Sequence, residues 1–143
     1  MANRNTETHT IPVRKVSSLN ADVDRPGVGI PINVYRTEDY VVVDAGLPRC
    51  RPENIRVTLA SGELLIQAER HPGQALVDER REYLVAELPY GAIERVISLP
   101  EMDLAFHAAE AHFRNGMLVV TIPTRERDAY LHGMHGEETP EED

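Results

Sequence analysis

The sequence predicts an all-β fold, an antiparallel β-sandwich of seven to eight short strands. Three observations lead to this prediction. Short segments with alternating apolar and polar residues recur along the chain, and turn residues such as Pro, Gly, Asn and Asp separate them. Aromatic residues make up only 5% of the chain, with no Trp, so the core must be built from aliphatic residues that lean towards strands. No segment carries a convincing helical pattern.

The first half of the predicted sandwich contains two strand pairs. Val41, Val43 and Ala45 share one face of the second strand, because successive side chains of a strand point to opposite faces. The clearest hairpin joins the third and fourth strands through the two-residue turn Ser61-Gly62. The four predicted strands cover residues 32–36, 40–46, 55–60 and 63–70.

A long polar loop follows the hairpin. Residues 71–82 contain Pro72, Gly73 and several charged residues, with no apolar period. Loops of this length inside a compact domain are uncommon and often functional. The short segment 83–86, which comes directly after the loop, has β character.

The second half of the sandwich is predicted from two further turn signals. Pro100 ends one strand, and Asn115-Gly116 is the strongest hairpin signal in the chain, because both central positions of a type I′ turn need a positive φ. Residues 104–112 (LAFHAAEAH) also have helical propensity, but the Asn-Gly hairpin requires a strand before it. The predicted strands cover residues 93–99, 109–114 and 118–122.

The composition divides the chain into three parts. Residues 1–29 are polar with few large apolar groups, and we expect a mobile N-terminal arm. Residues 30–124 form the sandwich domain. Residues 125–143 are expected to be a disordered acidic tail, since the last seven residues (EETPEED) carry five acids and no apolar side chain.

The charge and the single cysteine narrow the function classes. A net charge of −9 disfavours nucleic acid and anionic membranes as partners. The sequence has neither a signal peptide nor an apolar stretch long enough to span a membrane, so we expect a cytoplasmic protein. Cys50 cannot form an internal disulfide. The neighbouring Arg49 and Arg51 could favour its thiolate, although an ordinary loop thiol is the preferred interpretation.

No motif in the sequence predicts an enzyme, a cofactor or a metal site. The nucleophile elbow, the P-loop and the dinucleotide-binding fingerprint are all missing. His107, Glu110 and His112 do not have the spacing of a zinc motif, and on a strand His107 would face away from the other two. His132 and His135 lie near acidic residues of the tail and do not predict a ligand cage.

Three segments resemble the small heat-shock protein family. Residues 89–100 (PYGAIERVISLP) are similar to the family's Tyr-Gly-x-Phe-x-Arg-x-Phe-x-Leu-Pro run. Residues 111–123 (AHFRNGMLVVTIP) are similar to its Ala-x-x-x-x-Gly-Val-Leu signature. Residues 32–48 (INVYRTEDYVVVDAGLP), with ENIRVTLASGELLIQAER after them, resemble its first strands. The resemblance extends from about residue 30 to 124, and the segments follow the family's order with the long loop in its place.

The resemblance implies an immunoglobulin-like sandwich, the α-crystallin domain, with flexible arms. In bacterial and plant members the long loop carries a strand to the partner subunit, so residues 83–86 are expected to pair with residues 32–35 of a second copy. Arg95 matches a family arginine at or near the dimer interface, where an ion pair with an acid of the partner or of the long loop is expected. The expected dimer-interface residues are Ile32, Val34, Tyr35, Tyr83, Leu84, Val85 and Arg95.

The chain also departs from the family pattern. Family members usually have a C-terminal Ile-x-Ile or Ile-x-Val pair that docks on a neighbour and builds large cages, and no such pair follows Ile122. Ile11-Pro12-Val13 in the arm, or Ile30-Pro31-Ile32 at the domain boundary, could dock instead. The arm contains no aromatic residue before Tyr35. We therefore expect a homodimer or small homo-oligomer rather than a large cage.

The predicted function is that of an ATP-independent holdase, which binds partly unfolded proteins and prevents their aggregation. Apolar side chains in a polar arm have no core to join, which makes them candidates for client binding, together with the groove beside the third strand and residues 109–111. Strand residues can equally belong to the core. The expected client-binding residues are Ile11, Val13, Val16, Leu19, Val57 and Leu59. The alternative is a co-chaperone or assembly module that binds one folded partner.

Overall fold

The computed structural model describes residues 6–19, 29–60, 62–73 and 81–138, with side chains as far as Gly133. It confirms the β-sandwich. The described residues form a five-stranded sheet in the order β1-β8-β9-β4-β3 and a four-stranded sheet in the order β2-β5-β6-β7. The strands are β1 (His9–Ile11), β2 (Val13–Lys15), β3 (Ile32–Arg36), β4 (Tyr40–Gly46), β5 (Arg56–Ala60), β6 (Glu63–Arg70), β7 (Gly91–Ser98), β8 (Glu110–Arg114) and β9 (Met117–Pro123).

The pairing of the strands follows the predicted turns. β5 and β6 pair antiparallel with Ala60 opposite Glu63. β8 and β9 pair antiparallel with Arg114 opposite Met117, and the turn between them has φ values of 53° at Asn115 and 76° at Gly116. Both values lie in the left-handed region that a type I′ turn requires, which explains the Asn-Gly pair.

The core lies between the two sheets and is almost entirely aliphatic. Alternate residues of the central strands β4, β6 and β9 are fully buried, as the period-2 pattern predicts. These include Val41, Val43, Leu64, Ile66, Leu118, Val120 and Ile122. Two 3₁₀ turns, η1 (Pro52–Asn54) and η2 (Phe106–Ala108), lie in the connections. The η2 turn occupies part of the segment with helical propensity, and the strand predicted after it is confirmed as β8.

The N-terminal segment corrects one prediction. Within the arm that was expected to be mobile, β1 pairs antiparallel with β8 and β2 pairs parallel with β5. Without these two strands, β5 and β8 would each present a row of unpaired backbone groups. Pro12, between β1 and β2, has no N–H to donate, which suits the point where the chain leaves one sheet for the other. The arm residues 1–5 and 20–28 lie outside the described part.

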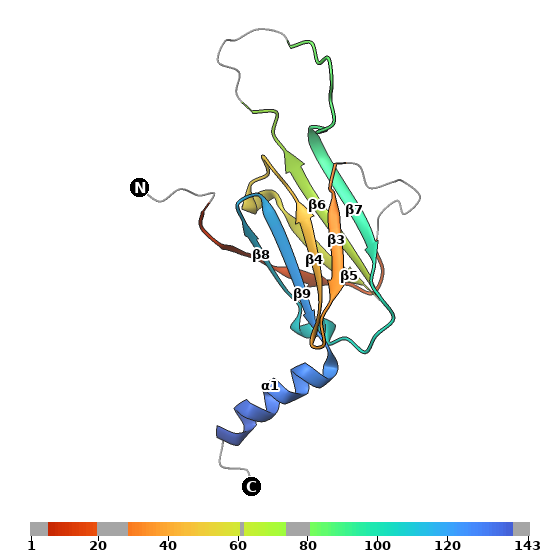
Figure 1. Ribbon diagram of the computed structural model, residues 1–143, viewed down its shortest axis with the longest axis vertical. Helices are drawn as coiled ribbons and strands as arrows, with labels where there is room; N and C mark the ends of the chain where they lie inside the picture. The colour runs from red at the N-terminus through yellow and green to blue at the C-terminus, as the bar shows by residue number, and fades with distance from the viewer. Residues whose placement is uncertain (1–5, 20–28, 61, 74–80, 139–143) are drawn as a thin grey trace.

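The C-terminal segment corrects another prediction. Residues 125–138, which were expected to be disordered, form the helix α1 (Arg125–Glu138). Thr124 caps this helix, because its Oγ1 accepts a hydrogen bond of 3.1 Å from the Arg127 N–H. The acidic residues Glu126 and Asp128 lie in the first turn, where they complement the helix dipole. The helix projects from one end of the sandwich, and residues 81–90 project from the opposite end (Figure 1).

Candidate protein-interaction surfaces

The residues 9–15, here called the N-terminal strap, cover two sheet edges at once. Ile11 lies opposite Ala111 of β8, and Val13 lies opposite Val57 of β5. Beyond the strap, the Val16 N–H donates a 2.9 Å hydrogen bond to the Leu59 carbonyl. The strap therefore passes from the edge of one sheet to the edge of the other, with Pro12 of the Ile-Pro-Val segment between its two strands.

The predicted client-binding residues separate into buried and accessible groups. Ile11 is only 3% exposed, so the expectation that arm residues have no core to join is wrong for this side chain. Val57 and Leu59 are likewise core residues, and Ala111 is buried while Ala109 is half-buried. Val13 and Leu19 are half-buried and Val16 is exposed. The strap thus pairs with the two strands beside which an open client-binding groove was expected.

The edge strand β3 forms a second surface. Among the described strands it pairs only with β4, so its other edge is free of a backbone partner. Val34 and Tyr35 of this strand are 42% and 49% exposed, while Ile32 packs against the core. An unpaired edge with exposed apolar side chains is suited to accept a strand from another chain.

The segment 81–90, here called the cover loop, lies over the end of β6. Its residues 83–86 adopt no strand in this chain, although β character was predicted. Leu84 and Val85 are largely exposed, at 87% and 76%, and Tyr83 is half exposed. The rings of Tyr83 and Tyr90 pack edge to face with centroids 5.4 Å apart. The cover loop therefore presents an apolar surface to solvent.

Arg95 acts inside its own chain. Its Nη1 donates a 2.9 Å hydrogen bond to the Ile30 carbonyl, just before β3. The structure shows no ion pair between Arg95 and an acid of the described loop residues, so the expected loop partner is not found in this part of the chain. The observed contact positions the start of the free edge strand, and an ion pair with an acid of a partner subunit stays a prediction.

Arg70 is a site residue that the sequence analysis missed. It is only 1% exposed, and its guanidinium donates hydrogen bonds to the carbonyls of Gly29 (2.8 Å), Pro48 (3.1 Å) and Pro89 (3.5 Å). Gly29 has a φ of +85°, and a Cβ there would lie 2.6 Å from the Pro89 ring. A signal existed, because Arg70 shares the inward parity of Leu64, Ile66 and Ala68 on β6.

Cys50 lies beside Arg70 and is 9% exposed. Burial raises the pKa of the Cys50 thiol, and the nearby Arg70 guanidinium opposes this shift without cancelling it. The suggestion that Arg49 and Arg51 favour the thiolate is therefore wrong. The Arg49 side chain instead donates a 2.7 Å hydrogen bond to the Pro72 carbonyl.

The histidines of the second half pair with carboxylates. His112 and Glu110 lie on one strand face, with Nε2 and Oε1 3.6 Å apart, while His107 approaches Asp128 Oδ2 at 2.9 Å. His132 Nδ1 lies 3.5 Å from the same Asp128 oxygen. Within the described residues no three His, Cys, Asp or Glu side chains are grouped to hold a metal ion. Nor does this part of the chain contain a helix with the length and hydrophobicity to cross a bilayer.

Comparison with known sequences identifies one family. The Hsp20/alpha crystallin family matches residues 33–133. The 18 kDa heat shock protein of Streptomyces albus G is 30% identical over 123 residues, which cover 82% of this chain and 84% of that protein. Heat shock protein 16 of Schizosaccharomyces pombe is 32% identical over 102 residues, which cover 67% of this chain and 66% of that protein.

Solved structures show the same fold. Heat shock protein 16.0 from Schizosaccharomyces pombe superimposes with a TM-score of 0.59 at 29% identity, and the match covers 70% of this chain and 90% of that chain. The hspA protein from Xanthomonas axonopodis superimposes with a TM-score of 0.56 at 29% identity, covering 67% of this chain and 93% of that chain.

Proposed function

Because this chain belongs to the Hsp20/alpha crystallin family of small heat-shock proteins, we propose that it is an ATP-independent holdase that binds partly unfolded proteins under stress. Family membership supports a chaperone role in the stress response. A holdase needs apolar surface and unpaired backbone that it can expose reversibly, and it needs no reacting group. The proposal places the protein in the cytoplasm, where a free thiol such as Cys50 stays reduced.

The N-terminal strap is the structural feature that best supports the proposal. Release of the strap would expose the backbone edges of β5 and β8 together with the apolar side chains of Ile11 and Val13. An extended segment of an unfolding client could then pair with the same edges. Ile11 and Val13 lie on the strap, and Val57 and Leu59 lie on β5, the strand with which β2 of the strap pairs.

To test the proposal, a model client protein is heated with this protein in the absence of ATP, and its aggregation is followed by light scattering. We expect the full chain to lower scattering. The double substitution Ile11→Ser with Val13→Ser weakens the strap, and we expect it to suppress scattering at a lower ratio of chaperone to client. Thr10→Ser is the matched control, because Thr10 is exposed on the same strap.

Two outcomes would contradict the proposal in different ways. If the full chain leaves scattering unchanged even in excess, the holdase function is wrong, and a co-chaperone or assembly module for one folded partner becomes the better hypothesis. If the full chain suppresses scattering but the double substitution abolishes suppression, the strap side chains bind the client themselves and do not guard the groove.

We further propose that two copies associate through the free edge of β3 and the cover loop. The exposed residues Val34 and Tyr35 would meet Tyr83, Leu84 and Val85 of the second copy. Light scattering coupled to size-exclusion chromatography measures the mass. We expect a dimer that Leu84→Asp converts to monomer, whereas Arg114→Gln, at an exposed position on β8, leaves it unchanged. A monomeric full chain at micromolar concentration would overturn this proposal.

A further inference from the structure

A cavity of about 650 Å³ lies between the end of β6 and the cover loop. Its walls are mostly apolar and include Tyr83, Val85, Leu88, Pro89 and Tyr90. The volume falls within the range of about 300–1,000 Å³ that is typical of small-molecule sites. Such sites combine apolar walls with a few polar groups, and this cavity has both.

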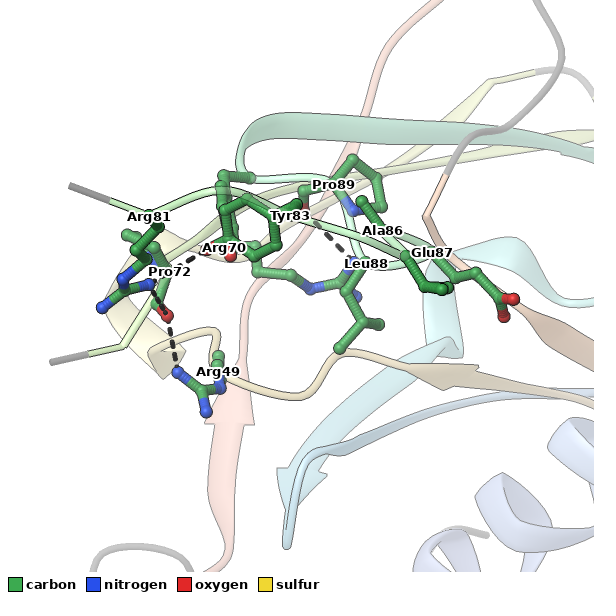
Figure 2. A pocket seen from close by; sticks show the side chains of 11 residues that line it. Arg49, Arg70, Pro72, Arg81, Tyr83, Ala86, Glu87, Leu88 and Pro89 are labelled. Atoms are coloured by element: carbon green, nitrogen blue, oxygen red, sulfur yellow. Dashed lines mark hydrogen bonds between the residues drawn. The ribbon is translucent and has the colours of Figure 1, made fainter. Parts of the chain in front are cut away.

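The polar side chains that line the cavity include three arginines. Arg49, Arg70 and Arg81 line it, and Figure 2 shows Arg49 and Arg81 together beside Pro72, with the Arg70 side chain extending away from them toward Leu88 and Pro89. Arg81 donates to the carbonyls of Pro72 (3.1 Å) and Gly73 (2.9 Å) and contacts the Tyr83 hydroxyl at 3.0 Å. Arg49 and Arg70 also donate to backbone carbonyls. All partners of the three guanidiniums among the described residues are therefore neutral.

These positive charges lack a counter-ion in the described part of the chain. The one carboxylate that lines the cavity belongs to Glu87, and it points away from Arg49 and Arg81 (Figure 2). A guanidinium has five N–H donors, and the hydrogen bonds of the three arginines to described residues leave donors free on each of them. A buried cation such as Arg70 is costly without a paired anion.

We propose that this cavity binds a small amphipathic anion, with a carboxylate at Arg49 and Arg81 and an apolar body against the tyrosines and Leu88. Planar guanidiniums bind carboxylates through paired, charge-assisted hydrogen bonds. The apolar walls offer few polar partners for a sugar or a nucleobase, which favours an aliphatic or aromatic body. This binding does not depend on the holdase activity.

The test uses decanoate as the probe and decanol as its uncharged counterpart. Titration of the ¹⁵N-labelled full chain, followed by NMR, reports on the Arg70 Nε–H and on the backbone of the cover loop. We expect decanoate to shift these signals with saturation, and decanol to bind at least about tenfold more weakly because it lacks the charge. Added salt should weaken decanoate binding, since part of the site is exposed.

Substitution of exposed arginines that line the cavity tests whether their positive charges are needed to bind decanoate. Arg70 is left intact because its replacement would disturb the core. The double substitution Arg49→Gln with Arg81→Gln should weaken decanoate binding about tenfold, while Arg114→Gln, another exposed arginine, should have no effect. The proposal is overturned if decanol binds as tightly as decanoate, if all variants bind equally, or if the shifted signals lie away from the cavity.

Discussion

Arg70 is the residue on which three separate segments converge. Its guanidinium links the chain before β3, the connection after β4 and the end of the cover loop through the carbonyls of Gly29, Pro48 and Pro89. Each carbonyl faces this buried guanidinium and accepts a hydrogen bond from it. The Arg70 guanidinium thus supplies these irregular segments with hydrogen-bond donors that the backbone of a neighbouring strand would otherwise provide.

Replacement of Arg70 should be costly. We expect Arg70→Met to lower the free energy of unfolding by about 2–4 kcal/mol, because the three carbonyls lose their donor while most of the volume is kept. Urea denaturation followed by circular dichroism measures the change. Arg114→Met, at an exposed position, should stay within about 0.5 kcal/mol. A similarly small change for Arg70→Met would show that the carbonyls find other partners.

Cys50 should behave as an unreactive thiol in the folded protein. Because burial raises its pKa, the neutral thiol is favoured by folding. This contribution to stability is fully present below the ordinary thiol pKa of about 8.5, and it is lost as the pH rises through the raised value of the folded state. At pH 8 we expect the native thiol to react with an aromatic disulfide reagent at least about tenfold more slowly than the urea-unfolded chain. Equal rates would contradict the burial of Cys50.

At the scale of elements, hairpins that depend on neighbouring residues were predicted, whereas elements that depend on distant segments were not. The β5–β6 and β8–β9 hairpins were predicted correctly because their turn residues and alternation act over a few neighbours. The strap was not predicted, because the three-residue strands β1 and β2 gain stability only from edges that other segments provide. A polar tail with little apolar content likewise gave no reason to expect α1.

Helix α1 depends on polar contacts with the sandwich. Arg125 and Asp103 form an ion pair of 2.8 Å, and the Asp128 carboxylate is shared by His107 and His132. Arg127 lies 3.9 Å from the carboxylate of Asp39 and 5.6 Å from the centre of the Tyr130 ring. Such partly exposed pairs are individually weak and are screened by salt. The helix is therefore expected to open locally more easily than the sheets.

Asp128→Asn tests this description of α1. Loss of the carboxylate removes the charge that faces both histidines, and we expect faster amide hydrogen exchange in residues 125–138, with little change in β4 and β9. Glu126→Gln is the matched control, because Glu126 is an exposed acid in the same helical turn. If both substitutions accelerate exchange equally, the helix dipole is responsible and the histidine contacts contribute little.

At the scale of the whole molecule, the sandwich could be predicted from the sequence, whereas its interaction surfaces could not. Period-2 alternation identifies Val57 and Leu59 as strand residues, but it does not tell which of two apolar faces is covered. Both belong to the core between the sheets, and their strand pairs with the strap, which lies more than forty residues earlier in the sequence. The cavity was missed for the same reason, because its arginines come from β6, the connection after β4 and the cover loop.

The anion site and the dimer require the cover loop in two different positions. An anion in the cavity needs residues 83–90 over Arg70, whereas the proposed dimer needs residues 83–86 against β3 of a second copy.

A ligand that binds only one of two states shifts the population towards that state. We therefore expect decanoate to increase the monomer fraction in sedimentation experiments at fixed protein concentration, and decanol to have little effect. The double substitution Arg49→Gln with Arg81→Gln should remove the response to decanoate. An unchanged mass while NMR shows the cavity occupied would mean that the cover loop stays on its own sandwich in the dimer, and that β3 alone supplies the contact between subunits.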